Sequence, residues 1–418
     1  MITYLKEAKR KNVILSKRKI VIIGGGFGGV KAALELAKDS NFDITLISAN
    51  SDFRIYSTLY RVATGGSMKL ASVPLEEIFT NRNVKLVIDT AKELNRENTT
   101  IKTGNGQIFT YHALVCALGV TTNYFGIKGL EEFSYGIKSP EEANALKDHL
   151  HKQLITDGKT DISYVVVGGG PTGVELAGAL PDYVKKICKH HGLPKRKIHV
   201  DLVESSSRIL PRMPKDISFR VKHHLKKSGV HVMTNKTVQA QTADALMVNN
   251  KPIRSHTVVW TAGVTNNPFF TDHNFQLAAN RKVRVDQFLQ AEPGIYVIGD
   301  NADTPYSGMA QVAIEDGKFV AENLKRITKG EAPLPYIAKK PIYVMPAGPR
   351  WAAVLWGKVR IHGILGWWLR RAADFMAYRD YEPWHMAIRR WMAEDEEEES
   401  CSICNDKLSR VLYESGSV

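Results

Sequence analysis

The clearest pattern of hydrophobic positions lies near the start of the chain. A β-branched run at 20–23 ends in glycines and passes into alanines and leucines at helical spacing up to residue 37. This order predicts the strand, tight turn and helix of a dinucleotide-binding βαβ unit. Gly24 would permit the tight turn, Gly26 would let a pyrophosphate approach the backbone, and Gly29 would let the helix pack on the strand.

The same pattern returns at residues 162–180. An apolar strand is followed by Gly168, Gly170 and Gly173 at the same spacing, and then by a helix rich in small residues. A single glycine motif is weak evidence because many turns need glycine, but its repetition makes the signal strong. Two dinucleotide folds predict two bound dinucleotides, and a flavin with a nicotinamide that exchange a hydride is the economical pairing.

Other apolar runs fill in an α/β chain. Strands are predicted at 42–48, 113–119, 198–204, 257–263 and 294–300, and helices at 74–79, 139–153, 215–228 and from 310 onward. The runs 84–89, 101–103 and 108–111 predict a small antiparallel piece, with a hairpin turn at 104–106. Residues 53–66 are predicted to be a loop that either packs round the flavin or is an ordinary hydrophobic loop.

Polar residues at strand ends are candidate cofactor ligands. Ser48 stands where dinucleotide folds usually carry an acid that bonds a ribose, and its hydroxyl can still do so. Glu204 ends the corresponding strand of the second motif and favours NADH, because its charge would repel the 2′-phosphate of NADPH. Arg208 lies close enough to temper that preference. Asp300 is placed to bind the ribityl or phosphate part of a flavin, although such an aspartate is more often a cap or turn residue.

Composition narrows the possible partners. The 418 residues are 44% hydrophobic and 24% charged, which is typical of a globular protein of two to three domains. A net charge of +14 indicates anionic partners. No familiar RNA- or DNA-binding motif occurs, so we expect phosphorylated cofactors or acidic lipid and no nucleic acid. Four scattered cysteines favour a reducing compartment.

Six motifs together resemble the type II NADH:quinone oxidoreductases, which are single-subunit enzymes that do not pump protons. The motifs are GGGFGG at 24–29, LVCALG at 114–119, GGGPTGVELAGAL at 168–180, VVWTAGV at 258–264, GIYVIGD at 294–300 and AQVAIEDG at 310–317. The resemblance covers most of residues 19–325. It implies an α/β protein with two Rossmann-like dinucleotide-binding domains, non-covalent FAD in the first, NADH in the second, and a membrane quinone as acceptor.

The resemblance also implies roles for single residues. Glu175 is expected near the meeting point of flavin, nicotinamide and quinone, and Gln311 and Glu315 are expected to face the quinone. Glu315 replaces the usual glutamine, so it is either a buried proton donor or a solvated surface glutamate. The expected FAD contacts are Gly24, Gly26, Phe27, Gly28, Gly29, Ser48, Ala117, Gly119, Gly299, Asp300, Gln311 and Val312. The expected NADH contacts are Gly168, Gly170, Pro171, Thr172, Gly173, Glu204, Ala262 and Gly263.

Cysteine positions argue against related chemistries. A disulfide reductase or a sulfide:quinone oxidoreductase needs redox cysteines beside the flavin. Cys116 lies in a core strand and Cys188 in a helix of the second domain, so neither fits. The pair Cys401 and Cys404 is only half of a possible zinc site, and we predict no metal. The alternative from another functional class is a flavin- and NADH-binding redox sensor, similar to an apoptosis factor, that oxidises NADH slowly.

The carboxyl-terminal part differs in composition. From residue 346 it holds six of the 7 tryptophans and many arginines, which predicts amphipathic helices lying in the headgroup region of an anionic bilayer. The alternative is a helix pair that packs on the flavin domain or on a second copy in a homodimer. We expect peripheral attachment to the cytoplasmic face of the cell membrane. The predicted domains are a basic arm at 1–18, FAD-domain parts at 19–135 and 265–345, an NADH domain at 136–264, a membrane-association region at 346–393 and an acidic tail at 394–418.

Overall fold

The computed structural model describes residues 17–155, 161–194 and 197–393, so the predicted basic arm, acidic tail and Cys401–Cys404 motif lie outside the described residues. The chain divides into two compact units. The first contains the described residues up to Ser51, Leu75–Gly119 and Asn266–Ala338, and the second contains Asp52–Pro74, Val120–Thr265 and the residues from Lys339 onward. Among the described helices, none combines the length and the apolar character needed to cross a membrane.

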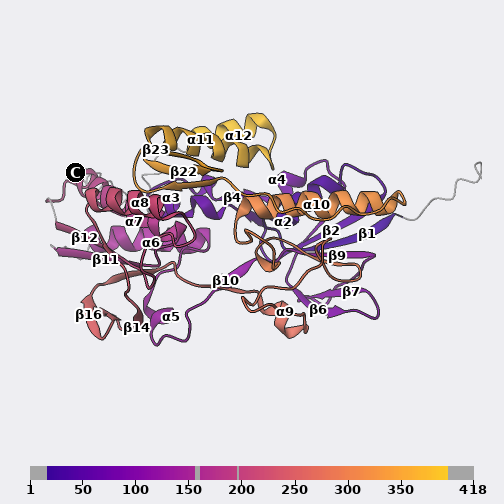
Figure 1. Ribbon diagram of the computed structural model, residues 1–418, viewed down its shortest axis with the longest axis horizontal. Coiled ribbons are helices and arrows are strands. Elements are labelled where there is room, and N and C mark those ends of the chain that lie inside the picture. Colours follow the sequence, from indigo (N-terminus) through magenta and orange to yellow (C-terminus); the bar gives the residue numbers. More distant parts are fainter. Residues whose placement is uncertain (1–16, 156–160, 195–196, 394–418) are drawn as a thin grey trace, which may run out of the picture. The chain divides into compact units, whose positions relative to one another are not determined.

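The first unit is built on a six-stranded sheet with the order β19-β20-β9-β1-β2-β5. Its strands are β1 (Arg18–Ile23), β2 (Phe42–Ser48), β5 (Val84–Ile88), β9 (Ala113–Cys116), β19 (Gln290–Glu292) and β20 (Ile295–Val297). All neighbouring pairs are parallel except β19 with β20. Helices α2 (Phe27–Leu36) and α10 (Ala310–Thr328) run beside each other over this sheet (Figure 1). They pack so closely that a Cβ on Gly317 would lie 2.5 Å from the Gly28 carbonyl oxygen.

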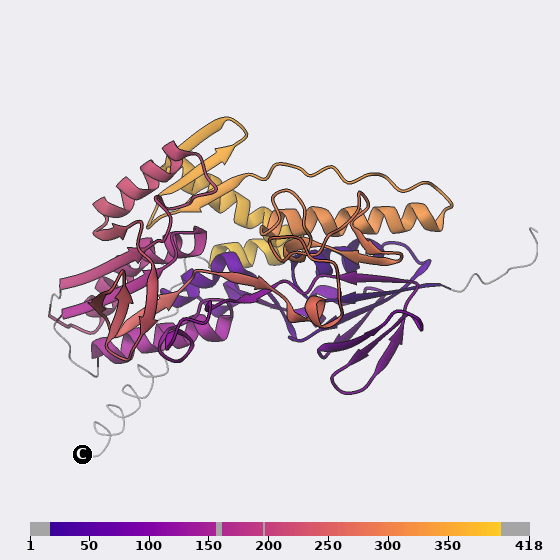
Figure 2. The ribbon, with the colours of Figure 1, turned by 60° about the horizontal axis from the view of Figure 1, so that its bottom comes forward.

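A small antiparallel sheet belongs to the same unit. It consists of β6 (Ala91–Asn95), β7 (Thr100–Thr103) and β8 (Ile108–Thr110), the purple strands at the lower right of Figure 2. The hairpin predicted at 104–106 is confirmed. The prediction that 84–89 pairs within this piece is wrong, because β5 pairs in parallel with β2. β5 is an edge strand whose side chains are all at least partly exposed, so its pattern lacks the continuous buried run of a central parallel strand.

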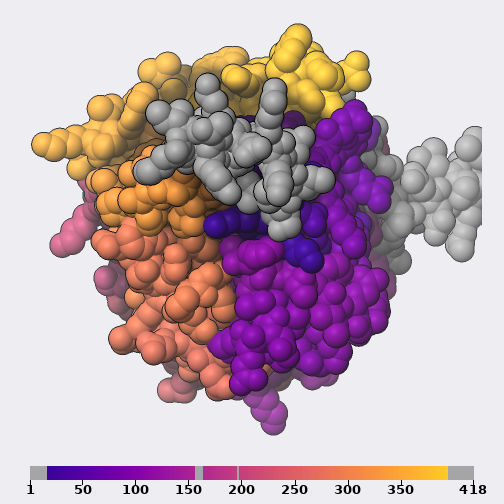
Figure 3. Space-filling view, turned by 90° about the vertical axis from the view of Figure 1, so that its right-hand side faces the viewer, coloured from indigo at the N-terminus to yellow at the C-terminus, as the bar shows by residue number. Residues whose placement is uncertain are grey.

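Distant stretches of sequence build the first unit together. Its core combines Val21 of β1, Cys116 of β9 and Val297 of β20 with Phe270 of α9 (Pro268–Asp272). Figure 3 shows the same joining at the surface, where purple residues from the first hundred lie against salmon and orange residues from 266–338. Because the two stretches share one core, the first dinucleotide fold cannot be completed without the later segment.

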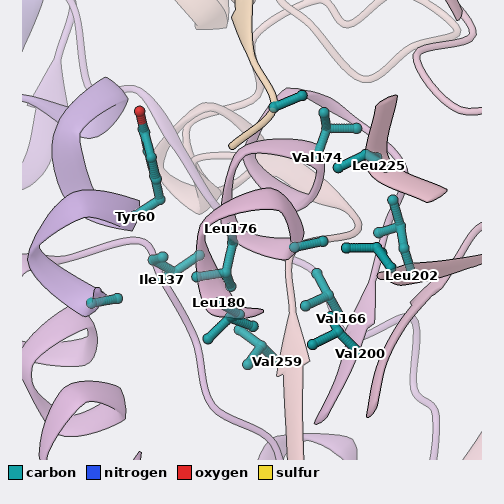
Figure 4. Packing of buried hydrophobic residues seen from close by; sticks show 14 of the residues in the cluster. Tyr60, Ile137, Val166, Val174, Leu176, Leu180, Val200, Leu202, Leu225 and Val259 are labelled. Carbon is teal, nitrogen blue, oxygen red and sulfur yellow. The ribbon is translucent and has the colours of Figure 1, made fainter. Parts of the chain in front are cut away.

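The second unit carries the other parallel sheet, with the order β13-β12-β11-β17. Its elements are α6 (Pro140–Ile155), β11 (Asp161–Val167), α7 (Pro171–His190), β12 (Lys197–Val203), α8 (Lys215–Lys227), β13 (Val230–Met233) and β17 (Thr257–Trp260). A three-stranded meander follows β13, formed by β14 (Val238–Gln241), β15 (Ala245–Val248) and β16 (Lys251–Arg254). In the core, Val174 of α7 lies beside Leu225 of α8 (Figure 4). The prediction of two Rossmann-like α/β folds is therefore confirmed.

Residues 52–74 belong to the second unit, although the predicted boundaries placed them in the FAD domain. They form β3 (Asp52–Arg54), η1 (Tyr56–Thr58), α3 (Leu59–Ala63), η2 (Met68–Leu70) and β4 (Ser72–Pro74) rather than an irregular loop. Leu59, Tyr60 and Val62 are buried in the same core as Leu176 of α7. Burial of these apolar side chains against α6 and α7 accounts for the difference.

The carboxyl-terminal segment begins with strands rather than helices. Residues 339–363 include the antiparallel strands β21 (Tyr343–Pro346), β22 (Ala352–Trp356) and β23 (Val359–Gly363). Helices α11 (Ile364–Arg379) and α12 (Trp384–Met392), coloured yellow in Figure 2, follow them. The helical prediction thus holds only from residue 364 onward, because Ala352–Leu355 form a buried strand.

The remaining elements connect these parts. They are α4 (Leu75–Phe79), β10 (Val120–Thr122), α5 (Leu130–Phe133), β18 (Val264–Asn266) and η3 (Gly299–Asn301). Along the chain, the compact units change after Gly119, after Thr265 and after Ala338.

Candidate cofactor and catalytic site

The first glycine turn has the geometry that a phosphate-binding turn requires. Gly24 has φ +111°, and a Cβ there would lie 2.2 Å from the Ala117 carbonyl oxygen. A Cβ on Gly29 would lie 2.0 Å from the Gly24 carbonyl oxygen, whereas a Cβ on Gly26 would meet nothing within 4 Å. Gly26 is also the N-cap of α2, and no side chain caps that helix start. The open N–H groups there fit a dinucleotide phosphate.

The second glycine turn repeats these features. Gly168 has φ +112°, a Cβ on Gly173 would lie 1.9 Å from the Gly168 carbonyl oxygen, and the space at Gly170 is open. Gly170 is the N-cap of α7, which starts with Pro171 and again has no side-chain cap. The neighbouring strand end contributes Ala262, whose backbone nitrogen would lie 2.8 Å from a Cβ on Gly168. Each unit therefore has its own place for a dinucleotide.

Ser48 is buried at the end of β2 and uses its hydroxyl locally. Its Oγ donates to the Asn50 carbonyl oxygen at 2.7 Å and accepts from the Asn50 N–H at 3.3 Å. A Cβ on Gly25 would lie 2.4 Å from this Oγ. A ribose contact through Ser48 therefore stays a prediction.

The predicted flavin residue Gly299 is held by a buried acid that the sequence analysis missed. Asp316 is fully buried and accepts from the Gly299 N–H at 2.9 Å and from the Tyr336 hydroxyl at 2.6 Å. Burial raises its pKa to about 6. Its spacing of four from Val312 and from Val320 was the available signal, since it places Asp316 on the apolar face of α10.

The two acceptor-site candidates on α10 lie on a more open face. Gln311 is exposed, and Glu315 is partly buried with its carboxylate 3.3 Å from the Lys318 ammonium. Glu315 is thus closer to the solvated alternative than to a buried proton donor. Contact of either residue with a quinone stays a prediction.

The second unit has a cavity of about 240 Å³ at the carboxyl ends of its parallel strands. Glu204 follows β12 and lines this cavity with Gly168 and Ala262 of the predicted NADH contacts. Arg208 does not serve this cavity, because its guanidinium donates to the Met213 carbonyl oxygen at 2.6 Å and to Ser218 Oγ at 2.7 Å. Arg208, which was expected to weaken the preference for NADH, therefore bonds residues near the start of α8 instead.

Glu175 is a buried acid of the second unit with a strongly raised pKa. It lies one turn into α7 and is only 8% exposed. Burial raises its pKa to about 8, while the positive charge of Arg61 lowers the pKa and the carboxylate of Asp374 raises it. Glu175 therefore holds a proton near neutral pH. Sequence reasoning selected Glu175 through the resemblance but did not find Arg61 or Asp374, which come from other segments.

Arg61 and Asp374 join α3 to α11. Arg61 Nη2 donates to Asp374 Oδ2 at 2.9 Å, and Arg370 Nη1 donates to the same oxygen. Arg61 Nε also donates to the Tyr60 hydroxyl at 3.1 Å, and Figure 4 shows this hydroxyl pointing away from the apolar core. The three charged side chains are nearly buried, so each depends on the others for charge compensation.

Several arginines of the carboxyl-terminal segment are internal and are not available to lipid headgroups. Arg370 and Arg371 are only 5% exposed, and Arg371 packs over the Trp391 ring at 4.4 Å. Arg390 forms a paired contact with Glu382, at 2.9 and 2.6 Å. Buried carboxylates stabilise these internal charges: Asp374 of α11 bonds Arg370, and Glu382, between α11 and α12, bonds Arg390.

A stripe of exposed apolar side chains remains on the outer face of these two helices. It is formed by Ile364, Leu365, Trp368, Met376, Trp384 and Met392, each more than half exposed. The four members on α11 fall within about a third of the helix circumference at 100° per residue. We call this set the apolar stripe.

The two described cysteines lie in the interior of the protein. Cys116 and Cys188 are both buried and neither forms a disulfide. Burial raises the pKa of Cys116 well above its usual range, which disfavours the reactive thiolate. No group of residues suited to a metal ion occurs in the described part of the chain.

Comparison with known proteins places this chain in a family. The model of the pyridine nucleotide-disulphide oxidoreductases matches residues 18–317. The chain belongs to this family. Two curated relatives are type II NADH:quinone oxidoreductases. The protein from Staphylococcus haemolyticus is 25% identical to this chain, and the one from Staphylococcus aureus NCTC 8325 is 26% identical. Each match covers 76% of this chain and 84% of the relative. The resemblance found in the six motifs is thereby confirmed.

Solved structures agree on the fold. NDH2 from Plasmodium falciparum in complex with NADH has a TM-score of 0.79 at 17% identity, covering 90% of this chain and 97% of that chain. The sulfide:quinone oxidoreductase of Aquifex aeolicus has a TM-score of 0.76 at 18% identity, with 87% and 91% covered. At these identities the likeness concerns the fold alone.

Proposed function

We propose that this protein is a peripheral membrane NADH:quinone oxidoreductase that uses FAD. The observation that carries the proposal is the pair of uncapped glycine turns, one in each unit, each with open space where a phosphate would approach. The names of the curated relatives supply the reaction, because both are type II NADH:quinone oxidoreductases.

The residues of the first unit would hold FAD. Gly24, Gly26 and Gly29 would receive its pyrophosphate at the start of α2, and Asp300 would bond the flavin chain beside the turn that Asp316 fixes. Bound FAD supplies hydride acceptance from NADH and two-electron delivery to an acceptor. The second unit would hold NADH with Gly170 and Gly173 at the pyrophosphate and Glu204 at the adenosine ribose.

Glu175 has the properties of a proton donor for quinone reduction. With a pKa of about 8 it carries a proton near neutral pH, and the pairing of Arg61 with Asp374 limits the charge near it. Reduction of a quinone to a quinol consumes two electrons and two protons, so a buried protonated acid is a suitable source. For Gln311 and Glu315 of α10, contact with a quinone is proposed from the resemblance alone.

The apolar stripe supports attachment to a membrane surface, where a quinone dissolves. Leu365, Trp368 and Trp384 would enter the headgroup boundary, and the exposed Arg379 and Arg389 would meet anionic lipid. The net charge of +14 favours the same surface. We propose that the protein attaches to the cytoplasmic face of the cell membrane. The same region is also proposed as the contact between two copies in a homodimer.

The test is anaerobic stopped-flow spectroscopy of the purified, detergent-solubilised flavoprotein. NADH should bleach the yellow flavin band, and a short-chain quinone should restore it rapidly. Replacing Glu175 with glutamine should slow the return and leave the bleaching nearly unchanged. Glu315→Gln should also slow the return if Glu315 contacts the quinone, and should leave it unchanged if Glu315 is a solvated surface residue. Bleaching without a quinone-dependent return would contradict the proposal and leave the redox-sensor alternative.

A further inference from the structure

A lysine lies beside Glu204 in the dinucleotide cavity of the second unit. The cavity wall on this side consists of Glu204 and Ser205 from the turn after β12, and of Lys236 and Thr237 from the turn after β13. Lys236 was not among the predicted contacts, because its turn follows a strand that carries no motif. The carboxylate-bearing Glu204 and the ammonium-bearing Lys236 therefore line the same wall, at the place where an adenosine ribose would lie.

Backbone hydrogen bonds fix the two turns against each other. The Glu204 N–H donates to the Met233 carbonyl oxygen at 2.8 Å, and the Lys236 N–H donates to the Glu204 carbonyl oxygen at 3.0 Å. The Asn235 N–H also donates to the Ser206 carbonyl oxygen, at 3.0 Å. Lys236 is thus held next to the acid by the main chain, independently of any attraction between the two side chains.

The carboxylate of Glu204 is fixed as well. Its Oε2 accepts from the Gly169 N–H at 2.6 Å, and its Oε1 accepts from the Ser206 N–H at 2.7 Å. The side chain cannot move aside without giving up both hydrogen bonds. Its negative charge therefore stays at the ribose position and would repel a 2′-phosphate.

We infer that Lys236 is a second specificity-determining residue of this site. Its ammonium group would bind the 2′-phosphate of a phosphorylated dinucleotide, and only the negative charge of Glu204 prevents this. The inference rests on the proposed binding of NADH. Arg208, the other nearby cation, is held by Met213 and Ser218 and takes no part. Removing the charge of Glu204 should therefore open the site to phosphorylated nicotinamide dinucleotides, and the gain should depend on Lys236.

Titration calorimetry of the purified holoprotein with two non-reacting probes tests this inference. The probes are 5′-AMP and adenosine 2′,5′-bisphosphate, which differ only in the 2′-phosphate. The proteins are the wild type, Glu204→Ala, and Glu204→Ala combined with Lys236→Met or with Lys251→Met. Lys251 is an exposed lysine of β16 outside the cavity and serves as the matched control. Glu204→Gln gives a neutral variant that keeps one acceptor oxygen, in case the alanine variant folds poorly.

The wild type should bind 5′-AMP more tightly than the bisphosphate. Glu204→Ala should bind the bisphosphate at least about tenfold more tightly than the wild type does, and Lys236→Met should remove most of that gain while Lys251→Met leaves it. The inference is wrong if the gain is absent or survives the loss of Lys236. If no variant binds either probe, the assignment of the NADH site is wrong together with the inference.

Discussion

Glu175 and Asp316 are single residues that folding has removed from water. Burial raises the pKa of Glu175 to about 8 and that of Asp316 to about 6. The sequence pointed to Glu175 only through its motif, and it pointed to Glu315 rather than to the neighbouring Asp316. Helical spacing favoured Asp316 as the inward residue, yet only the partners Gly299 and Tyr336 show how the buried acid is satisfied.

Glu175 should make stability depend on pH. Its pKa rises on folding from 4.5 to about 8, so its favourable contribution is complete below pH 4.5 and is lost as pH rises through 8. Glu175→Gln cannot ionise and should lose less stability over this window. The difference in melting temperature, variant minus wild type, should therefore grow between about pH 5 and about pH 8.5. A constant difference across that range would contradict the raised pKa.

Asp316 should position the Gly299–Asp300 turn for the flavin. The asparagine of Asp316→Asn has only one acceptor oxygen for the two donors, the Gly299 N–H and the Tyr336 hydroxyl. One of these two hydrogen bonds is therefore lost, which should lower the free energy of unfolding by about 1–3 kcal/mol. FAD should dissociate more readily from this variant, as measured by free flavin fluorescence after gel filtration. Glu315→Gln is the matched control, since its side chain is partly exposed and should change flavin retention little.

At the scale of elements, the junction of α3 and α11 is the feature that the pattern of the chain could not reveal. The residue pattern predicted amphipathic helices in this region. It could not show that Asp374 bonds two arginines: Arg370 on the same helix, and Arg61, which lies 313 residues earlier in the chain. The same contacts explain why the segment 52–74 is part of the second unit. A pair so distant in sequence leaves no local periodic signal.

Asp374→Ala should loosen this junction. It leaves Arg61 and Arg370 nearly buried without their carboxylate, which should lower the free energy of unfolding by about 3–5 kcal/mol. Urea denaturation measures the loss, and limited proteolysis should detect faster cleavage near α11. Arg379→Ala on the exposed face of the same helix should stay within about 0.5 kcal/mol of the wild type. Equal stability of the two variants would show that the ion pairs contribute little.

At the scale of the whole molecule, positive charge and exposed apolar surface point to the same kind of partner. The chain carries a net charge of +14, and the apolar stripe exposes residues such as Trp368 at 56% and Trp384 at 66%. Such side chains usually mark an interaction surface when they are contiguous. Anionic lipid satisfies both the charge and the apolar face.

The combined variant Leu365→Ser and Trp368→Ser should bind anionic vesicles more weakly. Both side chains are more than half exposed, so fold stability should change little while co-sedimentation with phosphatidylglycerol vesicles falls several-fold. Raised salt should weaken the binding of both proteins, because part of the attraction is electrostatic. Phe219→Ser, at an exposed apolar residue of α8 outside the stripe, is the control. Unchanged binding of the double variant would exclude the stripe as the membrane contact.

Several elements of the fold follow from the local pattern of residues alone. The strand at 42–48, both glycine turns and their helices, and the hairpin at 104–106 follow from alternation, helical spacing and the backbone freedom of glycine. Tertiary structure alone decided where residues 52–74 belong, which arginines of the tail are buried, and that Lys236 stands beside Glu204. These outcomes depend on contacts between distant segments, whose free energies of burial and charge pairing arise only when the chain has folded.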